Sequence, residues 1–138
     1  MHSPSLLDLG RRAMEMQGFS QLLGTRLERF ETGSAELALD IAPKLSQQNG
    51  FVHGGVLAYL ADNALTYAGA SVLGIEVLTS EFKINYLRPA VGAGRLLAVA
   101  EVIGHGRTQA VCRCDVFIEA NGERKLCAAA QGTIRKTA

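Results

Sequence analysis

The 138-residue sequence has little net charge, and this shortage excludes several classes of partner. Its 14 lysines and arginines nearly balance 13 aspartates and glutamates, so the formal net charge is +1. Binding to nucleic acid or to an anionic membrane surface relies on a basic excess, and we expect neither as a partner. The sequence also lacks an apolar run of about 20 residues that would span a membrane, and it lacks a signal-peptide pattern at its start. We therefore expect a cytoplasmic protein.

Cysteine is scarce as well, and its spacing argues against a disulfide framework. The three cysteines are Cys112, Cys114 and Cys127, an odd number without the spacing of disulfide-rich domains. Cys112 and Cys114 alternate in a strand-like run and so share one face, but no second pair or histidine cluster completes a metal site. We expect the three side chains to pack as small apolar groups, and we predict no metal.

The length of the chain suits a single domain, residues 1–138, that is large enough for a real hydrophobic core.

The N-terminal part of the chain has the pattern of a short helix. Apolar residues recur at helical spacing over residues 4–17. Ser3 is the expected cap, Pro4 the first helical residue and Gly18 the end of the helix.

The rest of the chain predicts an α+β fold. Residues 25–31 and 34–41 have the pattern of a strand hairpin, and residues 54–70 that of a helix that is apolar on most sides and therefore buried. Four further strand-like runs cover residues 75–87, 95–103, 108–119 and 124–135. Asn121-Gly122 is a strong hairpin signal. We expect a curved antiparallel sheet of hairpin-linked strands, wrapped around the long central helix.

His53, Gly54 and Gly55 open the predicted central helix, and Asp62 follows two turns later in an apolar stretch. A charged side chain in such a place usually has a partner or a chemical role. The amide of a glycine at a helix N-terminus suits a developing oxyanion, because the helix dipole adds positive charge there. The segment therefore combines an oxyanion donor with a nucleophile or base, as acyl hydrolysis requires. Close packing alone would also explain the two glycines. A structural role, in which its carboxylate caps neighbouring backbone groups, would also explain Asp62.

These residues resemble the motif of a known family. The motif reads Gln47-x-x-Gly50-x-x-His53-Gly54-Gly55 followed by Leu60-Ala61-Asp62, and a second stretch reads Asn85-Tyr86-Leu87-Arg88-Pro89-Ala90. Both are similar to the hotdog-fold acyl-CoA thioesterases, and most of all to the subgroup that includes phenylacetyl-CoA thioesterases. The resemblance implies a hotdog fold, hydrolysis of an acyl-CoA thioester without a cofactor, and a homodimer or dimer-of-dimers tetramer with active sites at the subunit interface.

The resemblance also implies roles for individual residues. Asp62 of one subunit would act as nucleophile or general base, facing Gly54 and Gln47 of its neighbour. The Gly54 amide would polarise the thioester carbonyl, and Gln47 would hold the water or the carbonyl. Ser80 takes the place of the family's helper serine or threonine, although Thr79 is adjacent to it. His53 fits a structural role in the loop better than that of a base, and both readings stay open.

An acyl-CoA substrate also predicts binding residues. The acyl pocket would be lined by the faces of the central helix and of the strands, with Phe51, Gly55, Tyr59, Asn63 and Tyr67 as candidates. The phosphates of coenzyme A call for cations at the entrance, for which Lys83, Arg88 and Arg107 are candidates. Either an aryl or a medium-length aliphatic acyl group is compatible with the sequence.

Two other functions are compatible with this fold. A non-catalytic acyl-CoA binding module would bind the same ligand without turnover, although Asp62 favours catalysis. A hotdog hydratase or dehydratase would use a different arrangement of histidine and aspartate, which His53 and Asp62 match poorly.

Overall fold

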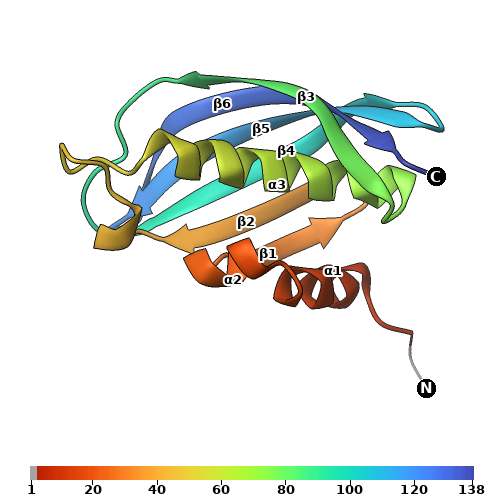
Figure 1. Cartoon of the computed structure of the whole chain (residues 1–138), viewed down its shortest axis with the longest axis horizontal. Helices are drawn as coiled ribbons and strands as arrows, with labels where there is room; N and C mark the ends of the chain where they lie inside the picture. The colour runs from red at the N-terminus through yellow and green to blue at the C-terminus, as the bar shows by residue number, and fades with distance from the viewer. Residues whose placement is uncertain (1–2) are drawn as a thin grey trace.

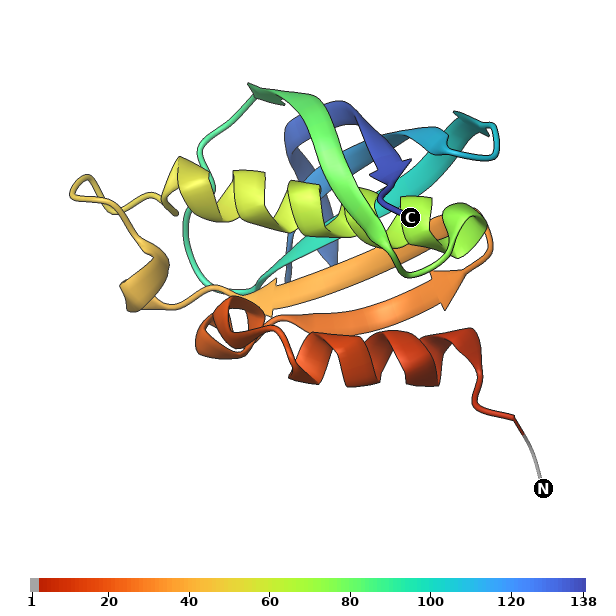
Figure 2. The same cartoon turned by 45° about the vertical axis from the view of Figure 1, so that its right-hand side comes forward.

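A curved antiparallel sheet wraps around one long helix in the computed structural model, which describes residues 3–138 (Figures 1 and 2). The six strands are β1 (Arg26–Glu31), β2 (Ser34–Asp40), β3 (Val77–Tyr86), β4 (Arg95–His105), β5 (Gln109–Ala120) and β6 (Glu123–Lys136). The helix α3 (Gly54–Leu73) lies across the concave face of the sheet. This arrangement is the hotdog fold and confirms the predicted architecture.

The helix α3 can lie close to the sheet because small side chains occupy its packed face. Ala61, Ala64 and Ala68 are fully buried. Gly69 packs so tightly that a Cβ atom there would lie 2.6 Å from Ile134 of β6. The helix runs three residues beyond the predicted end.

The strand order is β1-β2-β4-β5-β6-β3, which corrects one part of the prediction. The chain does not make a hairpin between β3 and β4. Instead β3 pairs with β6, and residues 87–94 cross the end of the sheet to reach β4. The predicted β5–β6 hairpin is confirmed at Asn121-Gly122, where both residues have positive φ angles (52° and 77°). The strands β1 and β3 are the edges of the sheet, and an unpaired edge favours association with another strand.

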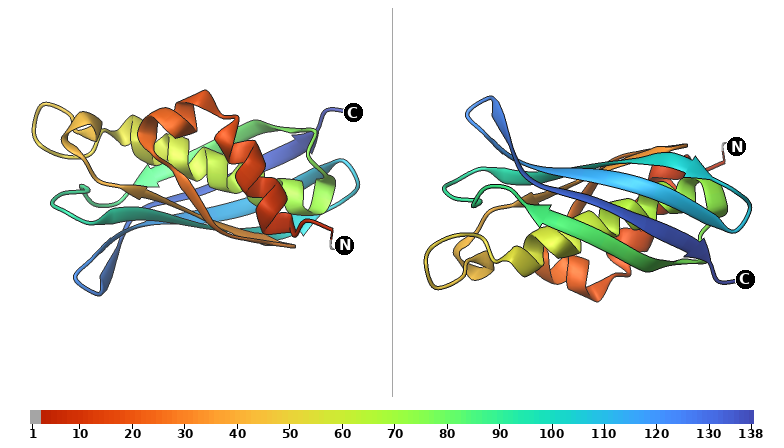
Figure 3. Two further views of the ribbon diagram at one scale, coloured as in Figure 1. Left: turned by 90° about the horizontal axis from the view of Figure 1, so that it is seen from below. Right: turned by 90° about the horizontal axis from the view of Figure 1, so that it is seen from above.

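The N-terminal region holds two helices where one is predicted. The helix α1 (Leu6–Glu15) starts later than predicted, because the side chain of Ser5 and that of Asp8 cap it reciprocally. Ser3 and Pro4 precede it. Gly18 begins a second helix, α2 (Gly18–Leu23), rather than ending the first. Seen from below, both helices lie over α3 (Figure 3, left).

The three cysteines are free and buried, as predicted. Burial raises the pKa of the Cys112 and Cys127 thiols to about 11, and it raises the pKa of Cys114 as well. Among the helices of residues 3–138, none combines the length and the apolar character that crossing a membrane requires.

Candidate active site

His53 caps the N-terminus of α3 and leaves one amide free. Its ring Nδ1 accepts a hydrogen bond from the Gly55 N–H at 2.8 Å, and its backbone N–H donates to the Leu45 carbonyl at 2.7 Å. The ring and the backbone of His53 together anchor the loop to the helix, which supports a structural role for His53. Within residues 3–138, no acceptor takes up the Gly54 N–H. That N–H is the free donor at the positive end of the helix dipole.

Gln47 lies in the same hollow as Gly54. The hollow has a volume of about 340 Å³ and is bordered by Tyr86 and Arg88 at the end of β3. The side-chain oxygen of Gln47 accepts the Asn49 N–H, so the amide N–H groups of Gln47 remain to donate to a ligand. The structure thus brings two predicted site residues, Gln47 and Gly54, together around a place that suits a carbonyl oxygen.

Asp62 is half-buried on α3 and is held by a threonine. Thr79 of β3 donates from Oγ1 to Asp62 Oδ1 at 2.6 Å. Thr66, one turn along α3, lies 3.0 Å from the Thr79 hydroxyl and donates to the Asp62 backbone carbonyl at 2.8 Å. The second carboxylate oxygen, Oδ2, has no hydrogen-bond partner in the described part of the chain. One oxygen is therefore fixed while the other is available for chemistry.

In the protomer, the hydroxyl that bonds to Asp62 is that of Thr79 and not that of Ser80, the predicted helper. The β3–β6 register shifts between Thr79 and Glu81, so that Ser80 is the extra residue of a β-bulge. Thr79 points toward α3, whereas Ser80 is exposed. The bulge interrupts the alternation of side chains, so that Thr79 faces the helix while Ser80 and Glu81 are both exposed.

Asp62 lines a second hollow, of about 540 Å³, between α2, α3 and β3. Tyr59 and Asn63, the residues predicted to line the acyl pocket, border this hollow, and their polar atoms bond to the N-terminal region around α2. The Tyr59 hydroxyl lies 2.6 Å from Ser20 Oγ, and Asn63 donates to Gln17 Oε1 at 3.0 Å. Sequence reasoning missed Gln17 and Ser20 because it did not foresee α2. Tyr67 is buried and donates to the Gly10 carbonyl at 2.9 Å, which makes it a structural link to α1.

The two hollows lie apart in one protomer. Gly54 and Asp62 are eight residues apart on α3, which corresponds to about 12 Å along the helix axis. A carbonyl group held by the Gly54 amide is therefore out of reach of the carboxylate of the same helix.

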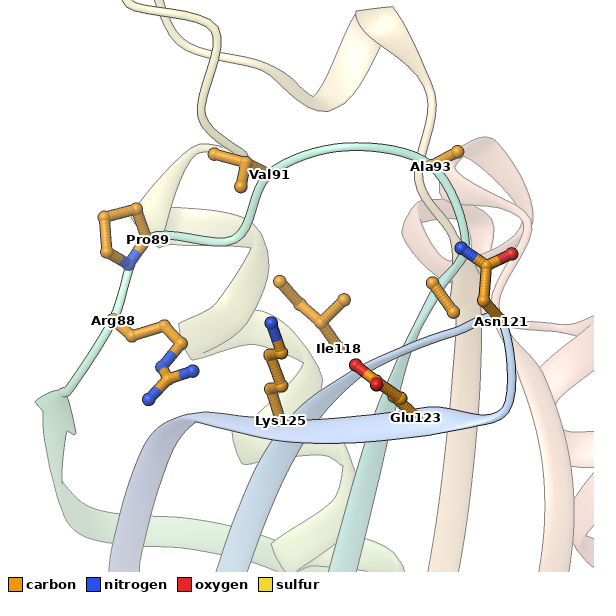
Figure 4. A pocket seen from close by; sticks show the side chains of 9 residues that line it. Arg88, Pro89, Val91, Ala93, Ile118, Asn121, Glu123 and Lys125 are labelled. Atoms are coloured by element: carbon orange, nitrogen blue, oxygen red, sulfur yellow. The ribbon is translucent and has the colours of Figure 1, made fainter.

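The cationic side chains predicted to contact the coenzyme A phosphates lie in different regions of the protomer. Arg88 borders the Gly54 hollow and also a neighbouring hollow of about 380 Å³. Figure 4 shows that Arg88 and Lys125 point into this neighbouring hollow, beneath the segment that follows β3. Among the described residues, neither makes an ion pair, although Glu123 lines the same hollow. Sequence reasoning missed Lys125.

Arg107 and Lys83 lie elsewhere. Arg107 lies in the β4–β5 turn, next to the start of β5, which pairs with the far end of β6. It is therefore at the opposite end of the sheet from Arg88 in the same protomer. Lys83 is exposed in the middle of β3. In residues 3–138, no three side chains among histidine, cysteine, aspartate and glutamate gather to hold a metal ion.

Known proteins are similar to this chain in sequence and in fold. A family model described as thioesterase superfamily matches residues 49–125, which include His53 and Asp62. Acyl-coenzyme A thioesterase PaaI of Escherichia coli is 27% identical over 118 residues, 86% of this chain and 81% of that protein. Medium/long-chain acyl-CoA thioesterase YigI of Salmonella typhimurium is 29% identical over 118 residues, 73% of this chain and 76% of that protein. The crystal structure of a thioesterase family protein from Silicibacter pomeroyi superposes with a TM-score of 0.88 at 33% identity, covering 95% of this chain and 97% of that one.

Proposed function

Because this chain belongs to the thioesterase superfamily and is a thioester hydrolase, we propose that it hydrolyses acyl-CoA to a free acid and coenzyme A, with Asp62 as the reacting carboxylate. One observation carries this proposal. The Asp62 carboxylate is held at Oδ1 by Thr79 and open at Oδ2, at the wall of a hollow wide enough for a ligand.

The Gly54 amide supplies the complementary half of the site. As the thioester carbonyl is attacked, negative charge grows on its oxygen, and the free Gly54 N–H together with the dipole of α3 stabilises that charge. One such donor is worth about 3 kcal/mol of transition-state stabilisation. The Gln47 amide N–H groups, in the same hollow, give a second donor to the oxyanion. Of the two predicted roles of Gln47, holding the water or holding the carbonyl, these free N–H groups favour the second.

Two routes lead from this site to products. In the first, Asp62 Oδ2 attacks the carbonyl carbon, the C–S bond breaks, coenzyme A leaves as the thiolate, and water then hydrolyses the mixed anhydride. In the second, Asp62 takes a proton from a water that attacks the carbonyl carbon, and the same C–S bond breaks. A single turnover in ¹⁸O-labelled water, followed by mass spectrometry of the Asp62 peptide, tests the first route. ¹⁸O in the carboxylate shows an anhydride that water opens at the aspartyl carbon, whereas water attack at the acyl carbon, in either route, places the ¹⁸O in the free acid.

The active form is a homodimer, or a dimer of such dimers, with each site shared between protomers. This proposal is supported by the separation of Gly54 from Asp62 on α3 and by the edge position of β3. Large apolar side chains on and just after β3 are exposed: Leu78 at 64%, Tyr86 at 54% and Leu87 at 55%. Pairing of β3 with its copy would cover the edge and bring the start of one α3 toward the Asp62 hollow of the other.

Arg88 and Lys125 are the proposed cationic contacts for the phosphates of coenzyme A. Arg88 borders both the Gly54 hollow and the hollow that holds Lys125. A ligand whose carbonyl lies at Gly54 therefore has a route past Arg88 to Lys125. The exposed turn residue Arg107 reaches the same ligand only from another protomer.

The competing functions lack a supporting observation. A hydratase would need His53 as an acid or base, but its Nδ1 already accepts the Gly55 N–H. A binding module would not need an open carboxylate oxygen in the ligand hollow.

The decisive experiment measures thiol release from a panel of acyl- and aryl-CoA thioesters by the native protein and by Asp62→Asn. We expect turnover by the native protein and its loss in the variant, with the circular dichroism spectrum and the oligomeric state unchanged. Equal rates for the two proteins would disprove the role of Asp62. Absence of turnover by either protein on every thioester would disprove acyl-CoA hydrolysis.

A further inference from the structure

We propose that Glu81 and Lys83 form two reciprocal ion pairs between protomers and thereby set the register in which β3 pairs with its copy. The proposal rests on the shared site proposed above and adds the residues that align its two halves. Both side chains are exposed, and they alternate with Phe82 and Ile84, which pack against the core. Glu81 and Lys83 therefore share the outer face of the sheet, away from α3.

Neither charge has an ionic partner within the described part of the protomer. The strand β6 places neutral side chains beside them, with Thr133 opposite Glu81 and Gln131 opposite Lys83. The ion pairs of residues 3–138 join side chains of the other five strands. The other side of β3 is the open edge of the sheet, so a partner for these charges has to come from the strand that covers this edge.

Few registers fit antiparallel pairing of β3 with its copy. Side chains directly opposite each other share a face of the sheet, so a two-fold axis sets one residue of β3 opposite its own copy. With Glu81 at the axis two carboxylates meet, and with Lys83 at the axis two ammonium groups meet. With Phe82 at the axis, Glu81 lies opposite the partner's Lys83 on both sides. Opposite charges stabilise a cross-strand pair and like charges destabilise it, so the charges favour the register centred on Phe82.

This register matters for the site because β3 carries a contact to each half of it. The Tyr86 hydroxyl donates to the Gly54 carbonyl at 3.1 Å, and a Cβ atom on Gly54 would lie 3.4 Å from the Tyr86 ring. Toward the other end of β3, Thr79 holds Asp62. The register of β3 against its copy therefore fixes how far the Gly54 amide of one protomer lies from the Asp62 carboxylate of the other.

The register centred on Phe82 brings the two halves together. Ser80 is the extra residue of the β-bulge and is left out of the count. Counting outward from Phe82 then sets the partner's Tyr86 opposite Val77. Because Val77 lines the Asp62 hollow, the start of the partner's α3, which accompanies its Tyr86, lies at that hollow. The charges and the geometry of the site thus agree on one register.

Cross-linking through single cysteines reads the register directly. Residues directly opposite in an antiparallel pair have Cα atoms about 4.5–5.5 Å apart, within the range that a disulfide needs, whereas diagonal neighbours lie about 7–8 Å apart. Glu81→Cys and Lys83→Cys, co-expressed with two different affinity tags and oxidised with diamide, should cross-link in the mixed dimer and in neither homodimer. The native protein, whose three cysteines are buried, controls for background.

Every other result overturns the proposal. Cross-linking of the Glu81→Cys homodimer would place Glu81 at the axis, and cross-linking of the Lys83→Cys homodimer would place Lys83 there. Absence of a cross-link in all three dimers would show that β3 does not pair in this register. Because cross-linking needs no turnover, mixed dimers that cross-link in a protein without thioesterase activity would leave the alignment standing and hydrolysis refuted. Hydrolysis without these cross-links would refute the alignment alone.

Charge reversal tests the ion pairs themselves. Glu81→Lys or Lys83→Glu alone sets like charges opposite each other twice in each dimer, and we expect the dissociation constant of the dimer to rise about 10-fold at low salt. The variant that combines both changes restores opposite charges and should regain native dimerisation and kcat. Glu101→Lys is the matched control, because Glu101 pairs with Arg113 of the same protomer at 3.7 Å. Sedimentation velocity provides the measurement, and a combined variant as weak as the single ones would refute the ion pairs.

Discussion

Thr79 donates a hydrogen bond of 2.6 Å to Asp62 and sets which carboxylate oxygen is free. The two residues lie on different elements, β3 and α3, and the bond holds the proposed reacting carboxylate against the sheet. Replacement of Thr79 by the isosteric valine should reduce kcat about 10- to 100-fold, because a hydrogen bond to a charged group is worth about 1.5–3 kcal/mol. Thiol-release kinetics on hexanoyl-CoA provide the measurement.

The controls for this prediction use neighbouring hydroxyls. Thr79→Ser should retain most of the native kcat, because serine keeps the hydroxyl donor. Ser80→Ala should lower kcat less than Thr79→Val does. A larger loss for Ser80→Ala would show that the helper hydroxyl acts at Ser80 in the assembled protein.

The Gly54 N–H can be deleted without breaking α3. Proline is well tolerated at the first position of a helix. The residue before it, His53, already has the extended conformation that a following proline favours (φ −58°, ψ 132°). We expect Gly54→Pro to lower kcat about 100- to 1,000-fold, the usual cost of losing an oxyanion donor. Gly54→Ala, whose Cβ would lie 3.4 Å from the Tyr86 ring, retains the N–H and is the matched control. Similar activity of Gly54→Pro and the native protein would remove the amide from the mechanism.

A site shared between protomers should allow complementation. Asp62→Asn and Gly54→Pro each destroy a different half of every site. In a mixed dimer, one site receives both defects and the other receives none. Co-expression with two affinity tags, followed by isolation of the mixed dimer, should therefore recover about half of native activity per dimer. A mixed dimer as inactive as either parent would indicate that both residues act within one protomer.

Arg88 and Lys125 should affect only substrates that carry the coenzyme A phosphates. We expect Arg88→Gln or Lys125→Gln to raise KM for hexanoyl-CoA up to about fivefold, because an exposed ion pair is worth at most about 1 kcal/mol. The same thioester of N-acetylcysteamine, which has no phosphate, should be unaffected. Arg12→Gln, an exposed change on α1, controls for net charge. Equal effects on both thioesters would contradict a phosphate contact.

Tyr67 should link stability to pH in the alkaline range. Burial raises its pKa from 10.0 to about 12, so between these values the unfolded chain has lost the phenolic proton while the folded chain retains it. The free energy of unfolding therefore falls as pH rises from about 10 to 12. Tyr67→Phe should remove this part of the fall, and at neutral pH it should cost about 1–2 kcal/mol, since the Gly10 carbonyl loses its donor. Urea unfolding at several pH values measures both effects.

The local features of the site were accessible from the sequence because they depend on neighbours in the chain. His53-Gly54-Gly55 at the start of an apolar helix and the small residues along it predicted a buried α3 with a free amide. Nothing local marked α2, because Gly18 carries the usual signal of a helix end. The second helix depends on distant contacts such as Ser20 with Tyr59.

The sequence alone determined the six strands and the central helix α3, because periodicity is a local property of the chain. It also determined that Asp62 lies on a helix that begins with a glycine, Gly54. Only the tertiary structure decided that β3 pairs with β6 and that a bulge at Ser80 turns Thr79 toward Asp62. A shift of one residue in a strand reverses which side chains face the helix. That shift depends on the partner strand, which no local pattern specifies.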